Sequence, residues 1–127
     1  MIRPTGRVRG PYGHPPGRSR STGGRTVFVG ALELDVLLGD VQSLKQKRSA
    51  VRPVLAELRR RYEVAVAEAG HHDLHRRALI GVAAVSGDAT HVRDLLDSCE
   101  RWVADRPDLE LLSAHRRLLG PEDEAGD

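Results

Sequence analysis

The chain has 127 residues, of which 30% are charged and 39% hydrophobic, and this length allows one domain with a modest core. Its single cysteine excludes a disulfide scaffold and a multi-cysteine zinc site, and it is typical of the reducing cytoplasm, where we expect the protein to reside. No apolar run approaches the roughly eighteen residues of a membrane helix, and no apolar segment of a secretory signal follows the N-terminus.

The charge is distributed unevenly along the chain. Residues 1–26 contain six arginines and no acid, and they are rich in glycine, proline and serine. Residues 120–127 contain four acids and no base. Both segments lack the apolar side chains that would offset the entropy cost of ordering, so we predict that both are disordered. The middle of the chain has 14 basic and 14 acidic residues, so the sequence pI of about 9.1 comes from the arm.

The basic arm, residues 1–26, has two interpretations. It could bind nucleic acid by neutralising phosphates, or it could be an extension without function. Our hypothesis is that native translation begins near Val27 and that the arm reflects a start codon placed too far upstream. Intact-mass spectrometry of the native protein tests this hypothesis.

The first predicted element is a strand over residues 27–38, in which apolar residues alternate with Glu33 and Asp35. Its expected apolar side consists of Val29, Ala31, Leu32, Leu34, Val36 and Leu38. A helix then begins at Ser43, whose hydroxyl can cap the backbone, and Gln46 three residues later completes a capping box. The helix should end near residues 59–62. Pro53 lies inside it and should kink or split it.

The apolar stripe of this first helix is expected to consist of Leu44, Val51, Val54, Leu55, Leu58 and Tyr62. A second strand follows at residues 63–70, a polar connection at 71–75, and a third strand from residue 77 to Gly87 that is apolar on both faces and therefore central.

Asp88 is predicted to cap a second helix that ends before Pro107, and residues 109–119 form the fourth strand. The apolar stripe of this helix is Val92, Leu95, Leu96, Cys99 and Val103, which makes Cys99 a core residue. The order β-α-β-β-α-β predicts one ferredoxin-like α+β domain at residues 27–119, with a four-stranded antiparallel sheet and both helices on one face. The other face is left for solvent or a partner.

The pieces "VGAL", "SLKQKR", "VAEAGHHDL" and "GVAAVSGD" occur in an order that resembles the YlxP-like family of small bacterial proteins, over roughly residues 27–119. The resemblance implies a ferredoxin-like fold and no established activity. Family members are often encoded beside translation-initiation and ribosome-maturation factors, which implies a link with translation. The arm, the acidic tail and Pro53 depart from the family pattern.

Cations are crowded at the start of the first helix, where the partial positive charge of the backbone disfavours them. Four of them, Lys45, Arg48, Arg52 and Arg59, should lie within about 60° of one another on the helix. With the free N–H groups of the first turn, they would form a site for phosphate. The alternative is an ordinary solvated face whose cations pair with acids such as Glu57. The candidate RNA-contacting residues are Lys45, Lys47, Arg48, Arg52 and Arg59, with Arg76 and Arg77 as auxiliaries.

The turn containing His71, His72, Asp73 and His75 has three interpretations. It could bind a metal, it could hold an acid–base pair such as His72 with Asp73, or it could be a polar turn that closes the sheet, which we favour. The sequence has no phosphate-binding loop and no recognisable catalytic triad. With only four aromatic residues, it also lacks the stacking platform of an RNA-recognition sheet. We therefore predict no catalytic residue, no metal and no cofactor.

We expect a non-enzymatic accessory protein of the translation or ribosome-maturation machinery that contacts RNA phosphates through this helix start. The alternative is a protein–protein interaction or homodimerisation module that pairs through its sheet. Salt dependence separates the two, because phosphate binding weakens steeply with salt.

Overall fold

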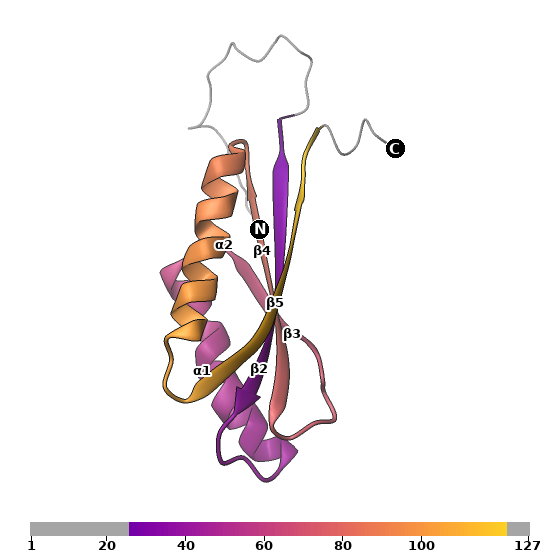
Figure 1. Cartoon of the computed structure of the whole chain (residues 1–127), viewed down its shortest axis with the longest axis vertical. Helices are drawn as coiled ribbons and strands as arrows, with labels where there is room; N and C mark the ends of the chain where they lie inside the picture. The colour runs from indigo at the N-terminus through magenta and orange to yellow at the C-terminus, as the bar shows by residue number, and fades with distance from the viewer. Residues whose placement is uncertain (1–25, 122–127) are drawn as a thin grey trace, which may run out of the picture.

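The computed structural model describes residues 26–121. The predictions of disorder for the basic arm and the acidic tail therefore fall almost entirely outside the described residues, as do the arginines of the arm. Figure 1 shows the chain with its elements labelled.

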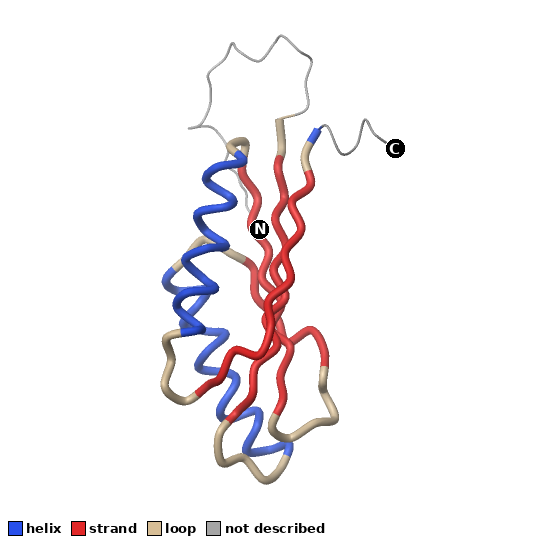
Figure 2. The backbone as a smooth tube through the Cα atoms, in the orientation of Figure 1, coloured by secondary structure: helices blue, strands red, loops and turns tan. Residues whose placement is uncertain are grey.

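The elements follow the predicted order. They are strand β2 (Phe28–Leu38), helix α1 (Leu44–Arg61), strand β3 (Ala65–Gly70), strand β4 (Arg77–Ser86), helix α2 (Ala89–Ala104) and strand β5 (Leu109–Leu119). The strands form an antiparallel sheet in the order β3-β4-β2-β5. Both helices lie on one side of this twisted sheet (Figures 1 and 2). The fold is the ferredoxin-like α+β arrangement, as predicted.

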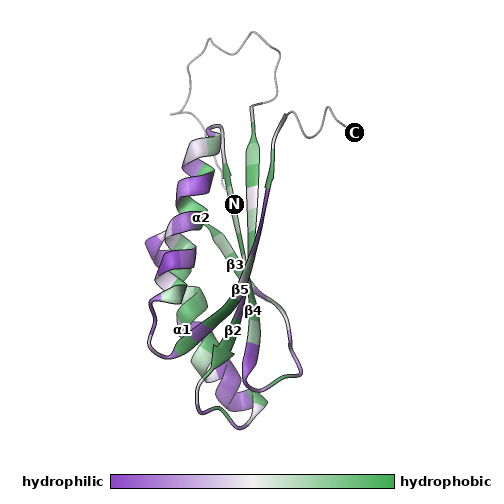
Figure 3. Ribbon diagram, in the orientation of Figure 1, coloured by the Kyte–Doolittle hydropathy of each residue, from purple (hydrophilic) through white to green (hydrophobic). Residues whose placement is uncertain are grey.

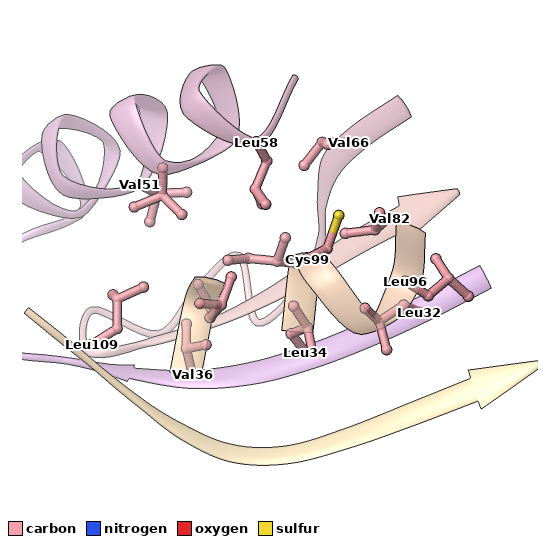
Figure 4. Packing of buried hydrophobic residues seen from close by; sticks show 14 of the residues in the cluster. Leu32, Leu34, Val36, Val51, Leu58, Val66, Val82, Leu96, Cys99 and Leu109 are labelled. Atoms are coloured by element: carbon pink, nitrogen blue, oxygen red, sulfur yellow. The ribbon is translucent and has the colours of Figure 1, made fainter. Parts of the chain in front are cut away.

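Strand β2 has a strict alternation because successive side chains in a strand point to opposite faces. Its even-numbered residues Leu32, Leu34, Val36 and Leu38 are buried beneath the helices, and Figure 4 shows several of them in the core. The prediction that Val29 and Ala31 share this apolar side is wrong. Both are exposed, because their odd register places them on the face that no helix covers.

Helix α1 is continuous from Leu44 to Arg61 although Pro53 lies inside it. We expected Pro53 to kink or split the helix, and of these two outcomes the split is wrong. Pro53 sits on the exposed side of the helix, where water can reach the carbonyl that proline leaves unpaired, while Val51 and Val54 on the opposite side anchor both halves to the core. Leu44, which we expected in the apolar stripe, is exposed.

Helix α2 begins as predicted, because the Asp88 carboxylate accepts hydrogen bonds from the backbone N–H groups of Thr90 and His91. The buried residues of α2 are Val92, Leu96, Cys99 and Val103. The prediction that Cys99 is a core residue is confirmed, and its burial raises the pKa of the thiol to about 11.

Two guanidinium groups enclose Trp102 near the ends of the helices. The Arg61 group from α1 and the Arg106 group that follows α2 lie 5.7 and 4.8 Å from the ring centroid. These cation–π contacts connect the ends of the two helices. Neither helix has the length and apolar character needed to cross a bilayer within residues 26–121.

Candidate functional site

The start of helix α1 is capped as the sequence predicts. Ser43 has extended backbone angles, and its hydroxyl oxygen accepts a hydrogen bond of 3.1 Å from the N–H of Gln46. The Gln46 side chain accepts a hydrogen bond from the N–H of Gln42, one residue before the position a capping box would use. An open hollow beside this first turn has both polar and apolar lining residues, namely Asp40, Val41, Ser43, Lys45, Gln46, Ser49 and Ala50.

Three cations project from one side of α1, beginning with Lys45 next to this cap, and we call Lys45, Arg48 and Arg52 the basic stripe. All three are exposed, and the first turn of α1 contains no acid. Within residues 26–121, none of the three has an ion pair or side-chain hydrogen bond. The stripe is therefore a concentration of uncompensated positive charge on one side of the helix.

Several other arginines have acidic partners, in contrast to the three residues of the basic stripe. Arg60 and Arg61 both bind Glu57, the one acid within α1, and lower the pKa of its carboxyl. Arg106 pairs with Asp108, and Arg116 pairs with Asp97 and Glu100. The alternative that Glu57 neutralises the stripe does not hold in this arrangement, because both carboxylate oxygens contact Arg60 and one also contacts Arg61.

Arg59 extends the stripe toward the sheet. Its guanidinium donates a hydrogen bond of 2.7 Å to the carbonyl oxygen of Val66 on the edge strand β3. Since β3 pairs with β4 on its other side, this bond satisfies a carbonyl that would otherwise face solvent. The stripe therefore runs along the side of α1 that faces the free edge of β3, with Arg59 fixed to that edge.

Lys47 does not lie with the other cations. Only 2% of its surface is exposed, and its ammonium group lies 2.8 Å from Glu68 Oε2 and donates a 2.5 Å hydrogen bond to the carbonyl oxygen of His71. The contact with Oε2 is an ion pair without good hydrogen-bond geometry, because this buried oxygen has no hydrogen-bond partner. The ammonium group of Lys47 is thus turned into the protein and is not presented to a ligand, contrary to our expectation.

The burial of Lys47 had a signal in the sequence that we missed. Lys47 precedes Val51, Val54 and Leu58 by four, seven and eleven residues, which is the spacing of one helix face. Glu68, in register with Ile80 on the helix-facing side of the sheet, supplies the opposite charge. A lysine on the apolar side of a helix requires such a partner.

Arg76 and Arg77 are held at the end of the sheet. The Arg76 Nε group donates hydrogen bonds to the carbonyl oxygens of Leu38 and Gly39. Arg77 binds Asp35 through two hydrogen bonds of 3.0 and 2.6 Å, and this pairing lowers the pKa of the Asp35 carboxyl. Both side chains are therefore already engaged, and the charge of Arg77 is compensated.

The histidine turn is tied to the same end of the sheet. His71 has a left-handed φ of 61°, which is uncommon for a residue other than glycine. Its Nε2 lies 3.3 Å from Asp35 Oδ2, and its carbonyl accepts hydrogen bonds from the Lys47 side chain and from the N–H of Leu74. These contacts hold the turn in its unusual conformation and connect it to α1 and β2.

His72 Nε2 lies 3.3 Å from the carbonyl oxygen of Glu68, so its ring is directed to the backbone and not to Asp73. Within residues 26–121, no group of three or more histidine, cysteine or acidic side chains is arranged to hold a metal ion. The contacts of His71 and His72 fit the interpretation of a polar turn that closes the sheet.

Comparisons with known proteins identify a family for this chain. Residues 29–116 match the model of a family described as "Protein of unknown function (DUF503)". The chain is similar to the uncharacterized protein YlxP of Bacillus subtilis (strain 168), with 27% identity over 83 residues that cover 65% of this chain and 90% of the relative. The matched region contains both helices, the sheet, the basic stripe and the histidine turn, and on this evidence the chain belongs to the DUF503 family.

Proposed function

We propose that this protein is a cytoplasmic, non-enzymatic accessory protein of the translation or ribosome-maturation machinery, and that it contacts RNA phosphates through the basic stripe. The observation that carries the proposal is that Lys45, Arg48 and Arg52 have no acidic partner within residues 26–121. Several other arginines do have such partners, among them Arg60, Arg77, Arg106 and Arg116. In the part of the chain that the structure describes, Arg93 and Arg101 of α2 also lack one, and the stripe differs from them in its position along α1 beside the edge of β3.

The physical argument concerns the start of α1. The helix dipole places a partial positive charge there, which repels Lys45 in the first turn, and the three cations of the stripe also repel one another. A phosphate group would remove this repulsion, and it could also accept hydrogen bonds from the free N–H groups of the first turn. RNA supplies such groups at regular intervals, and the gene neighbourhood of related proteins favours RNA over other anions.

Recognition would depend on shape and charge more than on base identity. Of the aromatic side chains, Trp102 is already enclosed by Arg61 and Arg106, and Tyr62 and Phe28 pack against the core. If the protein makes three phosphate contacts with an RNA duplex, its affinity should fall by about 40-fold when the salt concentration rises from 50 to 200 mM. Arg59, Arg76 and Arg77 could add contacts only by exchanging their present partners, so we assign them an auxiliary role. Lys47 is not part of the proposed surface.

A charge-matched pair of variants tests the proposal on the full chain. Arg48→Glu/Arg52→Glu reverses two charges on the basic stripe. Arg93→Glu/Arg101→Glu reverses two exposed arginines of α2 that also lack an acidic partner within residues 26–121. Binding to a structured ribosomal RNA fragment is measured by fluorescence anisotropy at several salt concentrations.

We expect the stripe variant to bind at least tenfold more weakly and to lower the salt slope by about two, since two phosphate contacts are lost. The α2 variant should stay within threefold of the wild type. If both variants lose affinity equally, binding reflects net charge alone and the stripe is not the site. If neither loses affinity, the proposed surface is wrong. Co-sedimentation of the same variants with purified ribosomal subunits extends the test to the assembled ribosome.

A further inference from the structure

The sheet has a second face that neither helix covers, and we call it the open face. Its centre consists of small residues from three neighbouring strands: Ala31, Ala65, Ala67, Ala69, Gly81 and Ala83. The register places Ala31 and Ala65 on either side of Ala83, and it places Ala67 opposite Gly81. The residues between them along the strands, Leu32, Val66 and Val82, are buried in the core on the other side of the sheet. These small side chains line an open hollow of about 320 Å³ with Glu33 at its border.

The open face is unusually apolar for a surface in contact with water. An antiparallel sheet with one solvated face normally alternates apolar and polar residues. Strands β3 and β4 instead place alanine, glycine, leucine and valine over most of this face, and Val85 is 66% exposed and Val29 38% exposed. The ion pair between Arg77 and Asp35 lies at one end of the same face. In Figure 3, β2 and β4 are coloured mostly as hydrophobic, whereas the helices alternate between hydrophilic and hydrophobic residues. Strands with this composition are typical of sheets that are buried on both sides.

The charges on the open face indicate what covers it. Glu33 lies on the inner strand β2, opposite His115, and Arg117 lies opposite Ala31 on the edge strand β5. Glu33 and Arg117 therefore share this face, two register positions apart along neighbouring strands. Both are exposed, and neither has an ion-pair partner within residues 26–121.

We propose that the open face is the interface of a two-fold symmetric homodimer, in which Glu33 of each copy pairs with Arg117 of the other. In a two-fold dimer the same surface of both copies meets, so that surface has to be complementary to itself. An acid and a base on one apolar face satisfy this condition, because one rotation forms two identical ion pairs. The alanine and glycine side chains allow the two sheets to approach closely around these pairs.

The size of the face fits a modest dimer. Four strands spaced about 4.8 Å apart and about seven residues long cover roughly 440 Å² on each copy, or about 900 Å² for the two together. This value lies below the roughly 1,000 Å² that stable specific interfaces exceed and is typical of weak, transient complexes. We therefore expect dissociation in the micromolar range, which is accessible to sedimentation equilibrium. The proposal does not depend on RNA binding, since its test contains no RNA.

A charge exchange on the full-length protein tests the interface. We expect Glu33→Arg and Arg117→Glu each to weaken dimerisation at least tenfold. In either variant, residues 33 and 117 of opposite copies would carry the same charge at both symmetric positions of the interface. The combined variant Glu33→Arg/Arg117→Glu should restore the wild-type dissociation constant to within about threefold. Asp94→Arg, on the exposed side of α2, is the control and should leave dimerisation unchanged. Circular dichroism verifies that every variant is folded.

Ala67→Arg on the open face provides a second, independent variant, and Ala56→Arg on the exposed side of α1 is its matched control. Only the former should dissociate the dimer. If the wild-type protein remains monomeric at about 1 mM, a concentration at which even weak complexes form, the proposal is wrong and the open face binds a different protein. A dimer that Ala67→Arg does not weaken, or single charge variants that the double variant does not rescue, would also overturn it.

Discussion

The buried ion pair between Lys47 and Glu68 gives the sharpest test of the structure. Lys47→Met keeps an unbranched side chain of similar length but removes the ammonium group. The variant loses the 2.8 Å contact with Glu68 and the hydrogen bond to the His71 carbonyl. The Glu68 carboxylate, one oxygen of which is fully buried, would then have no compensating charge.

The expected loss follows from this geometry. Removing one partner of a buried ion pair typically costs about 3–5 kcal/mol because the other charge is left uncompensated. The Glu68 side chain is 21% exposed, so water can solvate part of it, and we expect a decrease in the free energy of unfolding of about 3 kcal/mol. For a domain of this size, such a change lowers Tm by roughly 12–20 °C.

Urea unfolding, followed by circular dichroism and by the fluorescence of Trp102, the only tryptophan, measures this loss. Lys45→Met is the matched control, because Lys45 is exposed on the same helix two residues earlier. It should change stability by less than about 0.5 kcal/mol. The double variant Lys47→Met/Glu68→Leu should recover most of the loss, since apolar side chains can replace a buried ion pair at little cost. Equal stability of the Lys47→Met and Lys45→Met proteins would refute the burial of Lys47.

Three further predictions follow from individual contacts. Gly30→Ala should destabilise the protein by about 1–3 kcal/mol, because a Cβ atom there would lie 2.5 Å from a side-chain carbon of Val92 in α2. Gly39→Ala is the control, because no atom lies within 4 Å of a Cβ atom at that position. Urea unfolding compares the stability of the two variants. Asp35→Asn should be less stable than the wild type at pH 7, and the difference should shrink as pH falls from about 5 to 3. Arg77 lowers the pKa of Asp35 in the folded state, so the ionised carboxylate stabilises the fold above the unfolded pKa. This contribution is lost as pH falls through the folded pKa. A stability difference between the two proteins that does not change with pH would contradict the pairing. Cys99, whose pKa is raised to about 11 by burial, should react with a thiol reagent only as fast as the protein unfolds, and rapid labelling of the native protein would show that the thiol is accessible.

The proposed RNA surface and the proposed dimer interface lie on different parts of the fold. The basic stripe runs along α1 on the covered side of the sheet, beside the edge of β3, and the open face is on the other side. A dimer formed through the open face would therefore leave both basic stripes exposed. Two stripes in one dimer would double the number of possible phosphate contacts, so RNA affinity and its salt slope should both fall for the Ala67→Arg variant if both proposals hold.

The sequence by itself determined the elements and most of their buried faces. The alternation of Leu32, Leu34 and Val36 and the helical spacing of Val92, Leu96 and Cys99 identify a strand and a helix, because each period follows from local backbone geometry. The caps at Ser43 and Asp88 were also predictable, since a cap involves residues only two or three positions apart. The order of these elements then limited the topology to few arrangements, and the ferredoxin-like arrangement is the one observed.

Only the tertiary structure decided which charged groups are free and which are engaged. Lys47 meets Glu68 from a strand 21 residues later in the chain, and Arg77 meets Asp35 from 42 residues earlier. Such pairs depend on how α1 and the strands pack, which no local period encodes. Within residues 26–121, the same packing leaves Lys45, Arg48 and Arg52 without acidic partners, and Glu57, the one acid of α1, is held by Arg60 and Arg61.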